Sequence, residues 1–543
     1  MGFLPPKIPH LCAALLLAGG CTAPEEYIAD ADEQIYALLD QRRAELFEMD
    51  GGFRIERGPE VLRAQLLDGR DDGTQLNLTL FRALEIAAEN NRRYQDQREN
   101  LYRTALDLTL ERWRFSWQPS GNGNVGISGN GENPGIASVD ADLGVSRLFG
   151  SGALVLGNIG TTLLRALDRG DGWDAIQDIS LSFTLPLLRG SARAVVMEPL
   201  TQAERDLVYA VRSYERFRHT FTVDVVDNYY ALLRTLDNIA NEQANYESLQ
   251  LLRIRNQRLA EAAKLTDIQV DQARQDELRS ESRLSLLAES FGRQLDQFEI
   301  LLGLPTETNL VVDRAELEEL RSLDGSELLD LDPTLLGIFA LENRLDLMNL
   351  RDQEIDTERR TGIAADALRA GLELRASVNG TSQEGQPFAY KSSSLPWSFG
   401  LGLDLPVNQL PERNAYRLSL IIRDRAIRSA EESRDNVLAG VYDDFRQTQS
   451  TRQRYEIQLS AVLLADKRVR SAVLKLEAGR SSTRDVLEAQ AALLSAQNAA
   501  TSALLNFALA RLRLYRDLEL LDVDESGILL DASALPRAVE ITP

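Results

Sequence analysis

Two carboxylates near an expected helix start are the residues whose spacing best suits chemistry. Asp485 and Glu488 are three positions apart, so a helix would place them on one face. They follow Gly479, where the pattern predicts a turn. Two carboxylates on one helix face can attract cations. The spacing equally suits a solvated helix face, because the helix dipole favours acidic residues near an N-terminus.

Most other site chemistries lack their residues. The 543 residues include only two His and two Cys, and His10, Cys12 and Cys21 fall in or next to an expected processing segment. These counts argue against Cys/His zinc sites, cysteine nucleophiles, disulfides and a usual Ser–His triad. We expect His219 to be a packed or surface residue. The net charge of -23 argues against nucleic-acid binding, which needs a basic surface. We expect no catalytic residue, metal or cofactor.

Residues 1–20 have the pattern of an export signal. Lys7 precedes an apolar run, Leu11 to Leu17, that is too short to cross a bilayer of about 30 Å. Small residues then precede Cys21. They resemble a bacterial lipobox, and on this resemblance we predict lipidation of Cys21. The sequence departs from the pattern at Ala18, where Leu is preferred. A plain cleaved signal is the alternative. No later run is apolar enough for a membrane helix, so a membrane-spanning part would have to be a closed β-barrel.

Two segments have the composition of long helical hairpins. There is no Pro from Leu200 to Leu304 or from Glu412 to Leu535, and Gly is scarce. In the second segment Gly479 is followed by Ser481, Ser482 and Thr483, as expected where one helix ends and another begins. We predict hairpins over about 200–302 and about 412–520.

The two hairpins repeat each other. The shift that places Val225 on Val441 also places Ala262 on Ala478, without a gap. The chain is therefore predicted to be a tandem duplication with halves at 76–305 and 332–520 and a linker at 306–331. The outer segments 21–75 and 521–543 are expected to be irregular or to pack around the helices.

Each half also has a region of period two before its hairpin, which predicts strands. In the second half (about 372–406), Trp397 to Leu405 alternates apolar and polar residues, and in the first half (about 113–188), Ile179 to Leu185 does so. Phe115 to Ile127 and Leu372 to Val378 are weaker candidates for the upstream partner strands. Their Gly, Asn and Ser clusters, Gly121 to Asn124 and Asn379 to Ser382, are expected to be loops.

The first half carries an insert in its strand region. The offset between the two opening helices, Ala87 against Ala340, exceeds the offset between the two strand ends, Pro186 against Pro406. The insert is predicted as an extra hairpin at 137–168. This hairpin either joins the other strands or forms an extracellular flap.

The chain resembles the TolC-like outer-membrane efflux proteins over roughly residues 75–520. The segment Gly479 to Gln490, with Asp485-Val486-Leu487-Glu488-Ala489, is similar to that family's turn-and-helix motif. Leu265 to Arg274 is its counterpart in the first half. Leu301-Leu302-Gly303-Leu304-Pro305 resembles the end of the family's first repeat.

The resemblance implies a mainly α-helical fold with a membrane β-barrel. Three chains would close a 12-stranded barrel, or an 18-stranded one if the extra hairpin joins, that continues into a periplasmic α-helical barrel. It implies a homotrimeric outer-membrane lipoprotein channel that passively conducts substrates. An inner-membrane pump and a periplasmic adaptor would supply them, in tripartite efflux or type I secretion.

The resemblance also implies roles for residues at the hairpin ends. Asp485 and Glu488 would form acidic rings at a periplasmic aperture. The adaptor would contact two turns, although turn chemistry alone also explains their composition. These turns comprise Ala262, Ala263, Lys264, Leu265 and Thr266, and Gly479, Arg480, Ser481, Ser482 and Thr483.

The chain departs from the family where links hold the two hairpin ends together in the closed state. The family uses an Asp, an aromatic residue and an Arg, and the aligned residues here are Gln269, Leu476 and Ser481. Nearby Asp267, Asp271, Arg480 and Arg484 could substitute for them.

Two rival functions remain at the level of sequence. A periplasmic coiled-coil adaptor or scaffold would share the hairpins, but such a protein usually has one hairpin. A carboxylate-dependent hydrolase would need two carboxylates across a cleft, and hairpins this long offer no obvious cleft.

Overall fold

The computed structural model describes residues 23–47, 52–56, 62–67, 76–130, 135–166, 172–306, 308–322, 328–383, 386, 389–390, 395–524 and 527–530. The predicted signal peptide and Cys21 lie outside these residues. The chain divides into two compact units. Unit 1 comprises residues 1–54, 100–211 and 351–428, and unit 2 comprises residues 55–99, 212–350 and 429–543.

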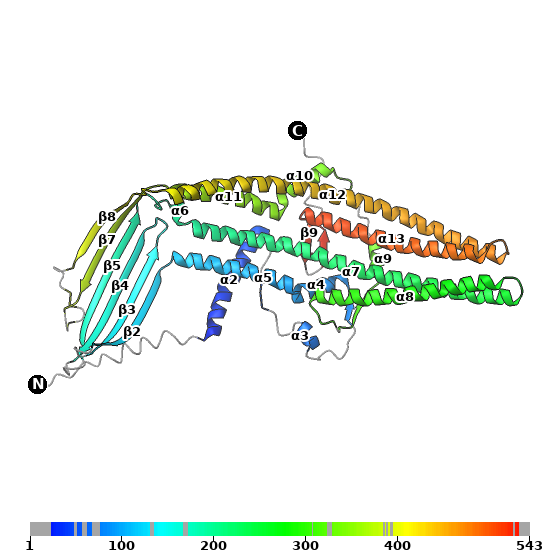
Figure 1. Ribbon diagram of the computed structural model, residues 1–543, viewed down its shortest axis with the longest axis horizontal. Coiled ribbons are helices and arrows are strands. Elements are labelled where there is room, and N and C mark those ends of the chain that lie inside the picture. Colours follow the sequence, from blue (N-terminus) through cyan, green and yellow to red (C-terminus); the bar gives the residue numbers. More distant parts are fainter. Residues whose placement is uncertain are drawn as a thin grey trace. The chain divides into compact units, whose positions relative to one another are not determined.

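Unit 1 contains a six-stranded antiparallel sheet in the order β2-β3-β4-β5-β7-β8 (Figure 1). Its strands are β2 (Gln118–Ser128), β3 (Ile136–Leu148), β4 (Leu154–Ala166), β5 (Asp174–Pro186), β7 (Gly371–Thr381) and β8 (Trp397–Asp404). The predicted extra hairpin is β3 and β4. It lies inside this sheet, between β2 and β5, and is not a separate flap.

The alternation of residue types gives the sheet one polar and one apolar face. Asn122, Asp142, Gly160 and Asp178 are successive partners across four strands, so they share one face. Most residues of this face are Ser, Thr, Asn, Asp or Gly. The opposite face is mostly apolar and includes Val125, Val139, Leu143, Ile159, Leu181, Val378, Phe399 and Leu401. Exceptions include Ile136, Leu148, Leu154, Leu156, Leu164 and Ile176 on the polar face and Arg147, Arg165 and Gln177 on the apolar face.

Two Gly/Asn clusters that were expected to be loops are strand residues, so that expectation was wrong. Gly121 to Asn124 pair with β3, and Asn379 to Thr381 pair with β5. Ladder hydrogen bonds and close packing outweigh the low strand propensity of these residues. At Gly380 a Cβ would lie 2.6 Å from Leu395 Cδ2, so a strand residue with a side chain would force its neighbours apart.

The N-terminal segment, which was expected to be irregular or to pack around the helices, contains helix α2 (Pro24–Phe47), and this helix contacts another helix. Its buried residues Ile35, Tyr36, Leu38 and Leu39 recur at helical spacing. Tyr102 on α5 (Arg92–Arg114) donates a hydrogen bond of 2.6 Å to Asp32 on α2. High charge content masks this apolar stripe in the sequence. Unit 1 also includes α6 (Arg193–Val196), the first part of α7 and most of α11 (Leu345–Asp366).

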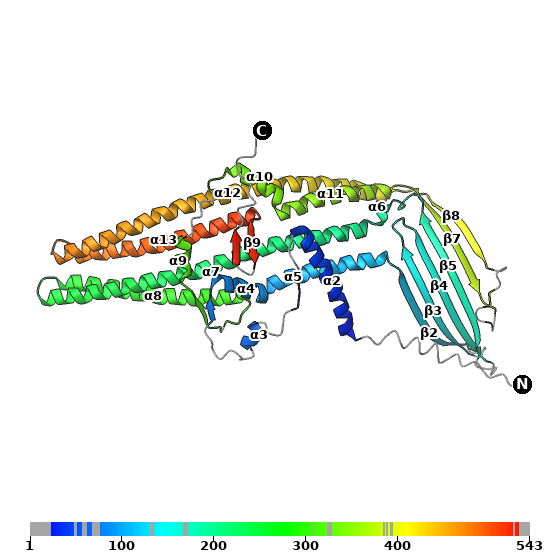
Figure 2. The ribbon, with the colours of Figure 1, turned by 180° about the vertical axis from the view of Figure 1, so that it is seen from behind.

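Two long helical hairpins dominate unit 2 (Figure 2). The first is formed by α7 (Glu198–Glu261) and α8 (Asp267–Leu302), and the second by α12 (Leu410–Glu477) and α13 (Thr483–Asp517). The shorter helices are α3 (Leu62–Leu67), α4 (Leu80–Asn90), α9 (Glu316–Ser322) and α10 (Pro333–Asn343). Strand β1 (Leu76–Leu78) pairs in parallel with β6 (Leu310–Val312). In the C-terminal segment, β9 (Leu521–Asp524) pairs with β10 (Gly527–Leu530), so this segment is not wholly irregular.

The main core of unit 2 lies where both hairpins meet α4, α10 and the β1–β6 pair. Tyr229 of α7 is fully buried there. Its hydroxyl donates to the carbonyl of Leu78 at 3.0 Å and to Glu316 at 2.8 Å. Burial, followed by the charge of Glu316, raises the pKa of Tyr229. This side chain therefore ties α7 to both the β1 strand and α9.

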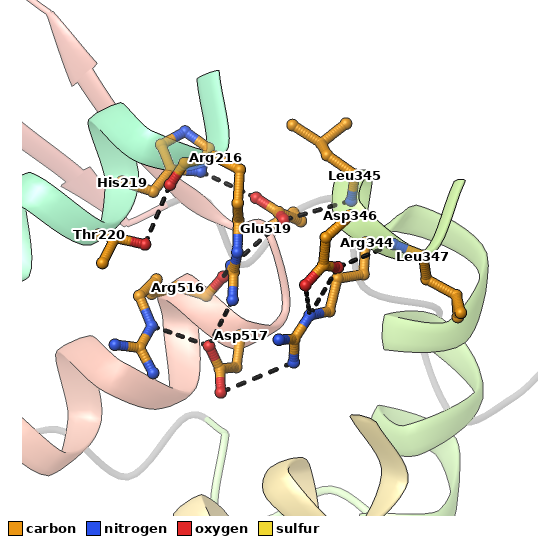
Figure 3. A network of polar contacts seen from close by, with 10 residues as sticks. All are labelled: Arg216, His219, Thr220, Arg344, Leu345, Asp346, Leu347, Arg516, Asp517 and Glu519. Atoms are coloured by element: carbon orange, nitrogen blue, oxygen red, sulfur yellow. Dashed lines mark hydrogen bonds and ion pairs between the residues drawn. The ribbon is translucent and has the colours of Figure 1, made fainter. Parts of the chain in front are cut away.

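A polar network joins α7 to the end of α13 and the start of α11 (Figure 3). Arg216 donates to Asp517 at 2.8 Å and to Glu519 at 3.2 Å. His219 Nδ1 lies 2.8 Å from Glu519 Oε2. Arg344 donates to Asp346 at 2.9 Å. His219, which was expected to be a packed or surface residue, thus takes part in a structural network.

Among the described residues, no helix has the length and apolar character needed to cross a lipid bilayer.

Candidate functional site

The two hairpin turns have the same backbone geometry. Lys264 donates its N–H to the carbonyl of Leu259, and Arg480 donates to the carbonyl of Lys475, at 2.9 and 2.8 Å. In each turn the preceding residue also donates its N–H to a carbonyl three residues earlier: Ala263 to Ala260, and Gly479 to Leu476. This is the Schellman arrangement, which satisfies the last carbonyls of a helix. The predicted adaptor-contact residues of both halves therefore form two equivalent turns.

The central residue of each turn has a left-handed conformation. Its φ is 56° at Ala263 and 67° at Gly479. Glycine adopts this conformation without steric cost, whereas alanine does not. The first turn therefore carries strain that the second avoids.

Asp485 supports the N-terminal cap of α13, whose N-cap residue is Ser482. Its Oδ2 accepts hydrogen bonds of 2.8 Å from Ser481 Oγ, Ser482 N and Ser482 Oγ. Ser482 Oγ in turn accepts from Asp485 N, which completes a capping box. The hydrogen bond from the Ser482 backbone and those from the Ser481 and Ser482 side chains lower the pKa of Asp485 to about 2. The carboxylate is therefore charged and local structure fixes its position.

Glu488 lies one turn further along α13 and is exposed. Arg484 Nε donates to its Oε1 at 3.0 Å. Both carboxylates thus have partners within their own turn and helix, as expected for a solvated helix face. This geometry also holds two fixed negative charges near the end of the hairpin.

A buried asparagine links the first hairpin to the second. Asn256 of α7 donates to Thr483 Oγ1 at 3.1 Å and to the carbonyl of Gln269 at 3.3 Å. Asn256 and Thr483 are both fully buried. One side chain therefore connects α7, the start of α8 and the start of α13.

Two further contacts join the hairpins near these turns. Arg255 of α7 forms an ion pair of 3.3 Å with Glu477, the last residue of α12. An apolar cluster packs Leu249 and Leu252 of α7 against both arms of the second hairpin. Its other buried members are Ala472, Leu476, Val486, Leu487 and Ala489.

The positions aligned with the family's linking residues have other roles here. Gln269 contributes its backbone carbonyl, Leu476 is buried in the apolar cluster, and Ser481 donates to Asp485. Of the four suggested substitutes, Arg484 pairs within its own helix. Within the described part of the chain, no ion pair joins Asp267, Asp271 or Arg480 to the opposite hairpin.

One feature of the sequence could have indicated the contact between Asn256 and the second hairpin. The shift that superimposes the two halves aligns Asn256 with Ala472, a buried member of the apolar cluster. A polar residue at a buried position that is apolar in the other half must find hydrogen-bond partners. Arg255 and Glu477 were also missed, because charged residues are common on any helix face.

A polar groove of about 670 Å³ runs beside the cluster, between α7, α8 and α13. Its wall includes Glu488 and Arg484 from the predicted aperture region, and Arg279 and Arg283 from α8. Glu242 in this wall is buried, and accepts from Ser280 at 2.5 Å and Arg283 at 3.1 Å. The described residues contain no group of His, Cys, Asp and Glu arranged to hold a metal ion.

Comparison with solved structures identifies the fold. The chain matches a structure of CusC, studied for transmembrane channel formation, with a TM-score of 0.59 and 15% identity over 81% of this chain and 91% of that chain. It matches the outer membrane protein VceC from Vibrio cholerae with a TM-score of 0.59 and 16% identity, over 81% of this chain and 95% of that chain. The Campylobacter jejuni CmeC outer membrane channel matches with a TM-score of 0.57 and 15% identity, over 88% of this chain and 91% of that chain.

The chain has the fold of outer-membrane channel proteins. This confirms, at the level of the fold, the resemblance to TolC-like outer-membrane proteins that the sequence motifs indicated. No protein-family model matches the chain, and a search of curated protein sequences gives no match.

Proposed function

We propose that this protein is a trimeric outer-membrane channel. It passively conducts substrates that an inner-membrane pump and a periplasmic adaptor deliver, in tripartite efflux or type I secretion. The observation that carries the proposal is the division of the six-stranded sheet into a polar face and an exposed apolar face.

The apolar face has the chemistry of a surface in contact with lipid. Trp397, Phe399 and Leu401 on it are 76%, 64% and 64% exposed in a single chain. Exposed apolar patches of this kind indicate a membrane or a protein partner. The opposite face, rich in Ser, Asn and Asp, suits a water-filled lumen. The outer membrane is therefore the location that we propose for the sheet.

Within the described residues, the sheet has two free edges, at β2 and β8. Unpaired backbone groups are very unfavourable in lipid, so strands of further copies would have to close the sheet into a barrel. The homotrimer is taken from the resemblance to TolC-like proteins. Cys21, if lipidated, would add an anchor in the same membrane.

The hairpins suit a periplasmic α-helical barrel built by the same three copies. Ile457, Leu463 and Leu464 on α12 are exposed in the single chain, and Leu463 and Leu464 are each about two-thirds exposed. Neighbouring hairpins would cover these side chains, since isolated helices do not keep such apolar surface in water.

The hairpin turns would contact the adaptor, and Asp485 and Glu488 would surround the aperture. The adaptor-contact residues are those of the two Schellman turns. Three copies would bring six carboxylates around the axis, where they attract cations. We propose no enzymatic activity and no cofactor.

Conductance of the detergent-extracted protein in a planar bilayer tests this function. We expect a small, cation-selective conductance that divalent cations block. The double variant Asp485→Asn, Glu488→Gln should lose the block, while an amide at position 485 can still accept the hydrogen bond from Ser482. The matched control is Asp296→Asn, Glu289→Gln on α8, which removes the same charge at exposed positions outside the groove that Glu488 lines.

Each outcome has a distinct meaning. Block that persists in the double variant would overturn the aperture assignment and leave the channel. A monomer that is stable without detergent and gives no conductance would overturn the channel. It would favour the periplasmic scaffold instead.

A further inference from the structure

We propose that all six strands of each chain line one outlet. A trimer then closes 18 strands and passes hydrated solutes that are too wide for a 12-stranded outlet. The proposal rests on the proposed channel function and goes beyond it, because it sets the size class of the substrate.

The inserted strands β3 and β4 are full members of the sheet. They pair with each other over their whole length, from Ile136↔Ala166 to Leu148↔Leu154. β3 pairs along all of β2, and β4 pairs with β5 from Leu154↔Thr184 to Leu164↔Asp174. A flap that leaves the membrane would not need to keep this ladder unbroken.

Most side chains of the insert follow the two faces of the sheet, and the exceptions, such as Leu156, Leu164 and Arg165, lie near the ends of β4. On the polar side, Asp142 lies between Asn122 and Gly160, and Asn158 lies between Gly144 and Ser180. On the apolar side, Leu143 is paired with Ile159, and both are exposed. An apolar outer face in register with the flanking strands is what a lipid-facing strand requires and a solvated flap does not.

The strand directions allow copies to join in a closed antiparallel barrel. Every neighbouring pair in the sheet is antiparallel, and the number of strands is even. The last strand, β8, therefore runs opposite to β2. The occupant that we propose for the free edge of β8 is thus β2 of a second copy of this chain, and the alternation continues around the ring.

The size of the outlet follows from the strand number. Barrel diameter grows roughly linearly with the number of strands, so 18 strands give a diameter about 1.5 times that of 12. Barrels of about 16 to 18 strands leave an aqueous channel. The insert therefore widens the outlet without any change in the residues of the hairpins.

The register suggests a variant that removes only the insert. Deletion of residues 131–171 leaves Gly129-Asn130 as a two-residue turn between β2 and β5. In the full-length sheet, Asn122, Asp142, Gly160 and Asp178 are paired in turn across four strands. Direct pairing of β2 with β5 in the deletion variant would therefore place Asn122 opposite Asp178. The polar faces of β2 and β5 then still coincide, and β2 remains antiparallel to β5.

Electron cryomicroscopy of the detergent-extracted assembly gives the first test. We expect 18 strands in the full-length protein and 12 in the deletion variant. A full-length barrel of 12 strands, with β3 and β4 outside it, would overturn the proposal. Because this count needs only the full-length protein, a deletion variant that fails to fold leaves the test intact.

Thiol labelling gives the second test, in a functional readout. Ser180→Cys on the polar face of β5 is treated with maleimide-polyethylene glycols of increasing mass in reconstituted vesicles. We expect the largest reagent that reacts to be several-fold heavier in the full-length background than in the deletion background. Leu181→Cys on the apolar face is the matched control, and should not react. The unsubstituted protein corrects for the native cysteines.

The failure of this proposal differs from the failure of the proposed function. An equal size limit in both backgrounds would overturn the wide outlet but not the channel. Reaction of Leu181→Cys as fast as Ser180→Cys, or the absence of any closed assembly, would instead overturn the membrane placement of the sheet.

Discussion

Asn256 of the first hairpin donates a hydrogen bond to Thr483 of the second, with 3.1 Å between Nδ2 and Oγ1. Both side chains are fully buried, and Thr483 is the first residue of α13. The bond therefore ties the turn that carries Asp485 to a helix of the opposite hairpin. In the proposed channel, separation of the hairpin ends would require this bond to break.

We predict that Asn256→Ala weakens the hairpin ends. It removes the bonds to Thr483 and Gln269 and creates a small cavity, so a loss of about 1–3 kcal/mol in unfolding free energy is expected. Thermal unfolding and mean open time in bilayers would measure the effect. The matched control is Gln257→Ala, whose exposed amide donates to Glu261 of the same helix at 3.5 Å. Equal effects of the two substitutions would contradict the role of Asn256.

We predict opposite effects of reciprocal changes at the two turns. Gly479→Ala should destabilise the protein by about 1 kcal/mol, because alanine is strained at a φ of 67°. Apart from its two chain neighbours, no heavy atom of the described residues lies within 4 Å of the added Cβ, so this cost would come from the backbone conformation. Ala263→Gly should be neutral or slightly stabilising, because it relieves the same strain. Unfolding free energies test both, and destabilisation of similar size by both would disagree with the backbone explanation.

We predict that the cap formed by Asp485 survives to strongly acidic pH. Hydrogen bonds from Ser482 and Ser481 lower its folded-state pKa to about 2, whereas an unfolded Asp titrates near 3.9. Its stabilising effect is therefore fully present above about pH 4 and is lost as the pH falls through about 2. The difference in melting temperature between wild type and Asp485→Asn should persist at pH 3.5 and disappear near pH 2. Disappearance already at pH 4 would show that the carboxylate is not held in this way.

We predict that Arg216 is essential to the network of Figure 3. Arg216→Met leaves the buried carboxylates of Asp517 and Glu519 with fewer partners, and a loss of about 3–5 kcal/mol is expected. Arg513→Met is the matched control, because the Arg513–Asp227 pair is about half exposed and should contribute only about 0–1 kcal/mol. Chemical unfolding of both variants measures the difference. A small effect at Arg216 would mean that Arg344, Arg516 and His219 compensate for its loss.

We predict that Asp444 makes stability depend on pH near neutrality. Burial, and then the carboxylate of Asp517, raise the pKa of Asp444 to about 7. The folded protein therefore holds a proton that the unfolded chain releases near pH 3.9, so stability falls as the pH rises from about 4 to about 7 and levels off above that. Asp444→Asn should flatten the melting temperature between pH 5.5 and 8 and raise it at pH 8. A variant with the wild-type pH profile would contradict the assignment.

The sequence predicted those elements whose own residues determine them. The turn at Gly479 was predictable because glycine suits a left-handed residue and Ser482 caps a helix. The strand at Trp397–Asp404 was predictable because its apolar and polar residues alternate strictly. Strand β2 was only partly predictable: Phe115 to Ile127 indicated a weaker strand, but Gly121 to Asn124 within it have low strand propensity and are held by their pairing with β3.

The residues that join the hairpin ends were less predictable than the turns themselves. Asn256, Arg255 and Glu477 act through partners that are distant in the chain or across a helix pair. Their side-chain types are common on helix surfaces, so only their burial or pairing distinguishes them. The comparison of Asn256 with Ala472 is the one case in which the internal repeat could have revealed a buried polar contact.

The pairing of β5 with β7 has a consequence for how the chain acquires its structure. Asp178 pairs with Thr381, and the whole first hairpin lies between these two partners in the sequence. Strands β2 to β5 are consecutive and can form early, whereas the sheet stays two strands short until β7 and β8 have emerged. Such distant pairing slows folding and leaves a sheet edge open in the meantime. A nascent chain of this protein therefore needs protection against aggregation for as long as its second half is still being made.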